Sequence, residues 1–221
     1  MNRRDFIRTS LAAAATAAGS ALMRGALPAA AATAGRAASA PSGGKQKILV
    51  LTGSPRREGN SNTLASQFIR GAQEAGHEVA RFDAALKKVN PCSACGRCGM
   101  NGPCVFNDDF SFVREHLVPA NVVVFATPMY YFGISAQLKA VIDRFYAVNG
   151  EIHVPKRAVL MMTYANSAAS EAQPIISHYE LLLSYLGWRD AGQIIVPGVW
   201  PVGAINGTRY PDRAYQLGKS I

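Results

Sequence analysis

The 221-residue sequence has no uncharged apolar stretch of the roughly 18–20 residues that a membrane-spanning helix needs, so we expect no membrane span. It also has no run of lysine and arginine, and the absence of such a run argues against a nucleic-acid partner. The net charge of +9 is unevenly spread, because residues 1–44 carry five Arg and one Asp. Apolar residues make up 49% and charged residues only 17%, which suffices for a packed core and excludes general disorder.

The sequence also lacks a recognisable acid–base pair and a histidine-based metal motif. Its four histidines are scattered, at His77, His116, His153 and His178. None of them lies at metal-ligand spacing from another histidine or from a cysteine. We therefore interpret them as surface or structural residues and name no catalytic residue.

The first 44 residues have the features of an export signal. Arg3 and Arg4 precede fifteen uncharged, alanine-rich residues (9–23), which are too few for a membrane span and typical of a signal peptide. The segment Arg-Arg-Asp-Phe-Ile resembles the twin-arginine signal. We expect residues 1–44 to be this signal and a linker, and the protein to be periplasmic or otherwise exported. A disordered tail, or a cytoplasmic protein with a misassigned start, is the alternative. That export route carries folded proteins, so the mature domain (45–221) is expected to hold a cofactor.

The mature chain alternates between strand and helix patterns. Short apolar segments predict strands at residues 47–53, 78–84, 121–126, 157–163 and 193–196. Helical spacing of apolar residues predicts helices at residues 61–74, 109–117, 135–146, 170–186 and 213–219. This alternation predicts an α/β fold, a flavodoxin-like doubly wound five-stranded parallel sheet with helices on both faces. Such sheets bind ligands beyond the carboxyl ends of their strands.

The segment that follows the first predicted strand, residues 53–63, has the composition of a phosphate-binding loop. Its glycines let the backbone approach a ligand, and the helix beginning near Ser61 would direct free N–H groups and a positive dipole end at it. Arg56 adds positive charge. Asn60 stands where a Walker A loop needs lysine, and Gly-Ser-Pro breaks the start of the dinucleotide-binding motif. A capped helix after a polar turn is the alternative.

Aromatic and methionine side chains follow the third predicted strand, at residues 128–133. Loops at such positions are usually polar, so these side chains would suit a flat apolar ligand. The alternative is that they pack into the core, as aromatic side chains often do.

Together the two segments resemble a known family. Gly-Ser-Pro-Arg-x-x-Gly-Asn-Ser, followed later by Thr-Pro-Met-Tyr-Tyr-x-Gly-x-x-Ala-x-Leu-Lys-x-x-x-Asp-Arg, is similar to the NADPH-dependent FMN reductase family and especially to its iron–sulfur flavoprotein branch. The resemblance covers residues 47–221 and implies FMN. It implies phosphate contacts from Ser54, Arg56, Asn60, Ser61, Asn62 and Thr63. It implies isoalloxazine contacts from Pro128, Met129, Tyr130, Tyr131, Phe132 and Gly133. Residues 163–167 are expected to line the far side of the ring.

All four cysteines lie within thirteen residues, at Cys92, Cys95, Cys98 and Cys104. Their spacing, Cys-x2-Cys-x2-Cys-x5-Cys, lets four thiolates converge and resembles the ferredoxin-like arrangement for a 4Fe-4S cluster. It is also similar to the iron–sulfur flavoprotein spacing. Disulfides or free thiols are an alternative in an exported protein. A zinc site fits less well, because zinc sites prefer two separated pairs.

These features lead to three functional hypotheses. The first is an FMN-dependent oxidoreductase that passes electrons from NAD(P)H through bound flavin to a quinone, a flavin or another small-molecule or protein acceptor. We expect little NAD(P)H outside the cytoplasm, so the second is an exported electron-transfer flavoprotein with an iron–sulfur cluster, reduced by a protein or quinol donor. The third is a non-catalytic flavodoxin-like module. The family resemblance also implies a homodimer or homotetramer.

Overall fold

The computed structural model describes residues 44–221, so the predicted export signal lies outside the described residues apart from its last position. The described chain forms one sheet whose five main strands are parallel and run in the order β2-β1-β3-β5-β6. These strands are β1 (Lys47–Thr52), β2 (Glu78–Asp83), β3 (Val122–Tyr130), β5 (Arg157–Thr163) and β6 (Arg189–Val196). The order changes direction between β1 and β3, as in flavodoxin-like folds, which confirms the predicted fold class.

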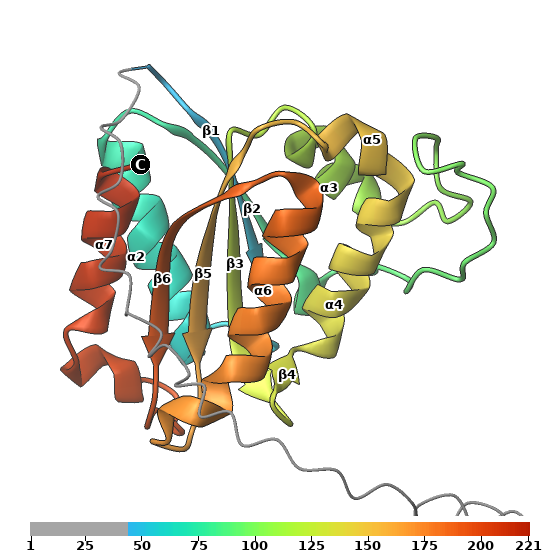
Figure 1. The fold of residues 1–221 in the computed structure, drawn as a ribbon. Helices are drawn as coiled ribbons and strands as arrows, with labels where there is room; N and C mark the ends of the chain where they lie inside the picture. The colour runs from blue at the N-terminus through green and yellow to red at the C-terminus, as the bar shows by residue number, and fades with distance from the viewer. Residues whose placement is uncertain (1–43) are drawn as a thin grey trace, which may run out of the picture. The chain divides into compact units, whose positions relative to one another are not determined.

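Helices cover both faces of this sheet (Figure 1). One face carries α2 (Asn60–Glu74) and α7 (Tyr210–Lys219). The other face carries α3 (Phe110–Leu117), α4 (Ala136–Asp143) and α6 (Gln173–Leu186). Side chains of β1 alternate between the two cores, with Ile48 and Val50 in one and Leu49 and Leu51 in the other. This alternation explains why β1 reads as a continuous apolar run in the sequence.

Two predicted boundaries near the expected ligand site were wrong. The third strand was expected to end at residue 126, but β3 continues to Tyr130, because Met129 and Tyr130 pair antiparallel with the short β4 (Gly133–Ile134). The helix predicted over residues 135–146 ends at Asp143 and continues as a 3₁₀ turn (Arg144–Val148).

Three further elements begin elsewhere than predicted. The last strand begins at Arg189, where it pairs with Arg157 of β5. Helix α6 begins later than residue 170, after a 3₁₀ turn (Ala169–Ala172), and helix α7 begins earlier than residue 213. Both helices have a proline in their first turn, where the missing N–H costs nothing.

The cysteine-containing segment, residues 90–108, forms no helix or strand, as expected for a long loop. Figure 1 shows it beside α4 and the short α5 (Asn149–Ile152), outside the layers of the sheet and its helices. Among the described residues, no helix has both the length and the apolar character to cross a membrane.

Candidate functional site

A cleft of about 510 Å³, solvent space at its mouth included, lies at the carboxyl ends of the central strands. Its walls come from four segments of the chain: residues 54–61, 128–130, 163–165 and 199–200. A second hollow of about 580 Å³ shares Met129, Tyr164, Ala165 and Trp200 with the first and reaches Tyr131 and Phe132. The two hollows therefore adjoin along these four residues.

One end of the cleft is the start of α2. Gly59 caps this helix without a side-chain hydrogen bond, and the first intrahelical bond runs from Thr63 N to Gly59 O. The N–H groups of residues 60–62 therefore precede the first intrahelical bond and are available to a ligand. The Ser61 hydroxyl is buried there, with 1% of the residue exposed, and has no partner among the described residues. A buried hydroxyl without a partner, at a helix start, fits the phosphate of FMN.

Asn60 holds a distant segment against this helix start. Its Nδ2 donates to the carbonyls of Val199 (3.3 Å) and Pro201 (2.9 Å), and its Oδ1 accepts from Ile205 N (3.3 Å). These bonds occupy the Asn60 amide within the protein. Residue 60 therefore contributes to the cleft by fixing the wall that Trp200 belongs to.

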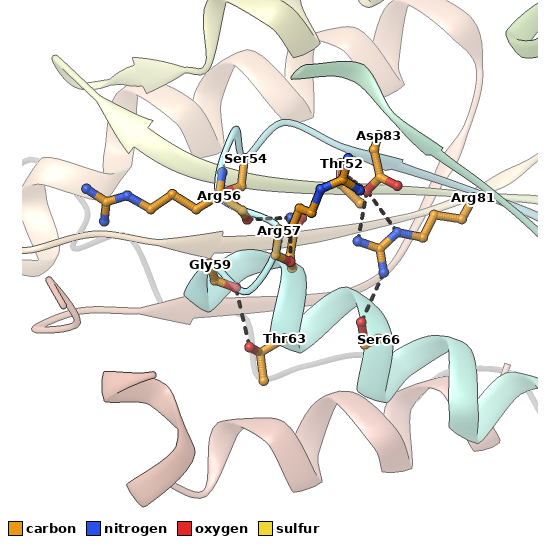
Figure 2. Close-up of polar contacts among 10 residues, drawn as sticks. Thr52, Ser54, Arg56, Arg57, Gly59, Thr63, Ser66, Arg81 and Asp83 are labelled. Atoms are coloured by element: carbon orange, nitrogen blue, oxygen red, sulfur yellow. Dashed lines mark hydrogen bonds and ion pairs between the residues drawn. The ribbon is translucent and has the colours of Figure 1, made fainter. Parts of the chain in front are cut away.

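The other predicted amide, Asn62, is also engaged within the protein. Its Nδ2 donates to the carbonyls of Arg56 (2.8 Å) and Arg57 (3.3 Å), whereas its buried Oδ1 has no partner among the described residues. Thr63 Oγ1 donates to Gly59 O at 3.3 Å, back along its own helix (Figure 2). Neither Asn62 nor Thr63 lines the cleft, so the structure places these two behind the loop rather than in its opening.

The loop before α2 is compact. Ser54 Oγ lies 3.2 Å from both the backbone N and the carbonyl O of Arg56. A Cβ on Gly59 would lie 2.5 Å from Ser54 Oγ and 3.0 Å from the backbone carbonyl of Arg56, so this close turn favours glycine. The side chain of Arg56 extends away from the Arg81–Asp83 ion pair (Figure 2) and forms no hydrogen bond or ion pair with any described residue. Its guanidinium is therefore available to an anion in the cleft.

Gly53, by contrast, serves packing within the protein. A Cβ at this position would lie 2.3 Å from Ser135 Oγ and 3.0 Å from Leu138 Cβ. Ser135 caps α4, and its Oγ accepts from Leu138 N. The missing side chain of Gly53 thus brings the end of β1 against the start of α4.

The opposite end of the cleft is a turn of exposed aromatic residues between β3 and β4. Tyr131 and Phe132 both have left-handed backbones, with φ of 46° and 62°. Such turns normally take Asn-Gly, so two aromatic residues here indicate a strained backbone. Tyr131 is fully exposed and Phe132 is about half exposed, so neither packs into the core. Met129 does pack against the core, which agrees for this residue with the alternative prediction that the segment packs into the core.

The wall between the two ends contains Tyr164 and Trp200. The Tyr164 hydroxyl donates to Ala168 O at 3.3 Å, and burial, aided by the charge of Glu171, raises the pKa of this phenol. Trp200, 70% exposed, was missed by sequence reasoning. The sequence did contain a signal for it: Trp200 is an aromatic residue in the loop after the last strand, just as Tyr131 is in the loop after the third predicted strand.

The four cysteines line a separate hollow, about 340 Å³ with the open solvent at its mouth included, together with Phe106 and Arg144. No disulfide joins them; Cys92 and Cys95 are exposed, and Cys98 and Cys104 are partly buried. A hydrogen bond from the Arg97 backbone lowers the pKa of Cys95. Within residues 44–221 no three His, Cys, Asp or Glu side chains lie close enough together to share a metal ion. The donor set, four sulfurs beside a buried cation, fits an iron–sulfur centre, although the sulfurs are not gathered around one point.

Comparison with known proteins identifies the family of this chain. A family model described as NADPH-dependent FMN reductase matches residues 46–205. The chain belongs to the NADPH-dependent FMN reductase family. It is 34% identical over 179 residues to an iron-sulfur flavoprotein of Archaeoglobus fulgidus, covering 79% of this chain and 78% of that protein. A match to the iron-sulfur flavoprotein MJ1083 of Methanocaldococcus jannaschii, 35% identical over 98 residues, covers 44% of this chain and 51% of the relative, about half of each.

Solved structures agree on the fold. The NAD(P)H:quinone oxidoreductase from Methanothermobacter marburgensis superposes with a TM-score of 0.63 at 18% identity, covering 80% of this chain and 96% of that one. As a member of the NADPH-dependent FMN reductase family, the protein is a flavin-dependent oxidoreductase, with FMN as its cofactor and a nicotinamide as the family's electron donor. The hypothesis of a non-catalytic module is thereby set aside.

Proposed function

We propose that this FMN reductase family member binds the FMN phosphate at the start of α2 and the isoalloxazine ring against residues 128–133. The observation that supports this best is the Ser61 hydroxyl. It is buried and has no partner among the described residues, and it lies where the first N–H groups of α2 are free. The same cleft reaches the aromatic turn at its other end. A phosphate-binding end and an apolar, planar end in one depression suit a phosphorylated aromatic cofactor.

In this proposal the protein's own residues bind and orient. Ser61, Arg56 and the helix N–H groups hold the dianionic phosphate by charge-assisted hydrogen bonds. Tyr131 and Phe132 border the ring site and exclude water from one side of it. When bound, FMN supplies the redox chemistry, accepting a hydride from a nicotinamide and giving its electrons to a quinone, flavin or other acceptor. Hydride transfer needs no protein acid or base, which agrees with our naming no catalytic residue.

An anaerobic visible spectrum tests the proposal. The purified protein should show flavin absorbance that NADPH bleaches rapidly. A colourless protein that does not take up added FMN would refute the binding site. A flavin band that NADPH leaves unchanged, but that a reduced protein or a quinol bleaches, would instead favour the carrier hypothesis.

The four cysteines support a second element of the function, a 4Fe-4S cluster that accepts electrons from the flavin. All four thiols line one hollow, and two relatives that are 34% and 35% identical to this chain over the matched residues carry the name iron-sulfur flavoprotein. Cys98→Ser should abolish bound iron and sulfide while leaving flavin content unchanged, with Asn107→Ala, an exposed residue of the same segment outside the hollow, as the matched control. Full iron in Cys98→Ser would refute the cluster. Thiols that resist alkylation until a disulfide reductant is added would favour disulfides.

The remaining parts of the proposal concern location and assembly. We also propose that residues 1–44 form a twin-arginine signal and residues 45–221 the mature FMN-binding domain. In this proposal the protein is exported and assembles as a homodimer or homotetramer. Replacing Arg3 and Arg4 together with lysine should keep the protein in the cytoplasm, as measured by cell fractionation. Light scattering of the mature protein measures the assembly, and a monomeric mass would remove the oligomer from the proposal.

A further inference from the structure

Arg144 is the largest fully buried side chain of the described protein. It begins the 3₁₀ turn that follows α4, and only 1% of its side chain is exposed. Its Nη1 lies 3.0 Å from Oδ2 of Asp108, a carboxylate that is equally buried. The rings of Phe106 and Phe110 cover the guanidinium, with centroids 5.2 and 4.7 Å from its central carbon. An ion pair removed from water to this extent is costly to maintain, so its retention needs a reason.

The ion pair holds both ends of the cysteine segment, residues 90 and 108, against the body of the protein. Arg144 Nη1 also donates to the carbonyl of Asn90 at 2.9 Å. Asp108 in turn accepts from the backbone N (2.9 Å) and Nδ2 (3.0 Å) of Asn90. All four cysteines lie between residues 90 and 108, so one guanidinium and one carboxylate fix the two points where this irregular segment leaves the body of the protein.

Arg144 also borders the hollow of the cysteines. It lines the hollow that the four cysteines line, and its Nε is buried with no partner among the described residues. Buried N–H groups of proteins nearly always have an acceptor, more so when they carry charge. Nε therefore lacks an acceptor among the described residues, and an anionic group bound in the hollow would supply one. Thiolates and the sulfides of a thiolate-bound iron centre are acceptors of this kind.

We propose that Arg144 is a positioning residue for a metal centre at the four cysteines. It anchors both ends of their segment through Asn90 and Asp108, and it directs its free Nε–H toward the anionic sulfur of the bound centre. This inference rests on the iron–sulfur part of the proposed function and extends it to a residue outside the cysteine motif. Hydrogen bonds and positive charge near cluster sulfurs stabilise the reduced, more negative state, so Arg144 raises the reduction potential of the centre.

Arg144→Lys is the decisive variant, because lysine keeps the charge and loses the planar fork and its Nε–H. The matched control is Arg81→Lys, which alters a partly exposed Arg–Asp pair of β2, away from the cysteine segment. The mature holoprotein is assayed for iron, sulfide and flavin, for the rate of iron loss to a chelator, and for the potential of the iron centre by redox titration. Arg144→Lys should keep its flavin, lose iron roughly 10–100-fold faster, as is typical when partners of metal ligands are changed, and show a more negative potential. Arg81→Lys should match the wild type.

A second variant distinguishes a specific loss of iron from a general folding defect. Breaking a buried ion pair from one side leaves an unpaired charge, whereas replacing both partners with apolar residues is often neutral. Arg144→Met combined with Asp108→Leu should therefore fold and bind flavin, yet lose iron as Arg144→Lys does. Wild-type iron retention and potential in either variant would overturn the inference. Wild-type protein with flavin and no iron would overturn it too while leaving the FMN proposal intact, and a protein with neither would overturn both.

Discussion

Ser61→Ala separates binding of the cofactor from stability of the fold. In the absence of ligand the Ser61 hydroxyl is buried without a partner among the described residues, so it pays a desolvation cost. Removing it should raise the free energy of unfolding of the apoprotein by about 1 kcal/mol. The same change removes a hydrogen bond to a charged phosphate, which costs about 1.5–3 kcal/mol of FMN binding, or roughly a 10–150-fold higher Kd. The two effects have opposite signs.

Two titrations measure this prediction. Urea unfolding of the apoprotein gives the stability change, and quenching of flavin fluorescence gives the Kd. Ser66→Ala is the control, because Ser66 lies on the same helix and its hydroxyl accepts from Arg81 Nη1 outside the cleft. We expect Ser66→Ala to leave the Kd unchanged.

The reasoning is refuted by either of two results. An unchanged Kd for Ser61→Ala would remove the hydroxyl from the phosphate site. A destabilised apoprotein would mean that Ser61 already has a partner before FMN binds, which would remove the observation on which the site rests.

Three further predictions use the same methods. Arg56→Ala should weaken FMN binding by about 1.5–3 kcal/mol through loss of a charge-assisted bond, and an unchanged Kd would exclude Arg56 from the site. Tyr131→Gly should raise the unfolding free energy in urea by about 1 kcal/mol, because glycine adopts the left-handed backbone without strain; no increase would show that the turn is relaxed. Burial lowers the pKa of Lys156 from 10.5 to about 8, so between these pH values the unfolded chain binds more protons and stability rises with pH. Relative to Lys156→Met, wild-type stability should therefore increase from pH 8 to pH 10.5, and a constant difference would contradict this.

The sequence predicts the order of strands and helices because each element carries its own periodicity. The buried run at Lys47–Thr52 and the helical spacing before Gly76 are local patterns, and both elements form as expected. The end of β3 was mispredicted because its continuation past Pro128, where the strand was expected to stop, depends on pairing with β5 at residues 127–128 and with β4 at residues 129–130. Pairing across a turn is a tertiary contact that local propensity does not record.

The candidate site was predictable in part for the same reason. Ser54 and Arg56 follow β1, and Ser61 lies in the first turn of the next helix, so the rule that ligands bind at the carboxyl ends of parallel strands identifies them. The roles of Asn60 and Arg144 were not predictable, because their partners lie far away in the sequence, at Val199 and Asn90. From residue type and spacing, an asparagine beside a helix start suggests a ligand contact. The structure shows instead that the Asn60 amide bonds to the backbone of residues 199–205.

The bonds from Asn60 to residues 199–205 have a consequence for biosynthesis. The helix start that would receive the phosphate is synthesised early, but one wall of its cleft is held by carbonyls some 140 residues later. A nascent chain halted before residue 199 lacks that wall, together with Trp200. The cleft is therefore complete only after nearly the whole polypeptide has been synthesised.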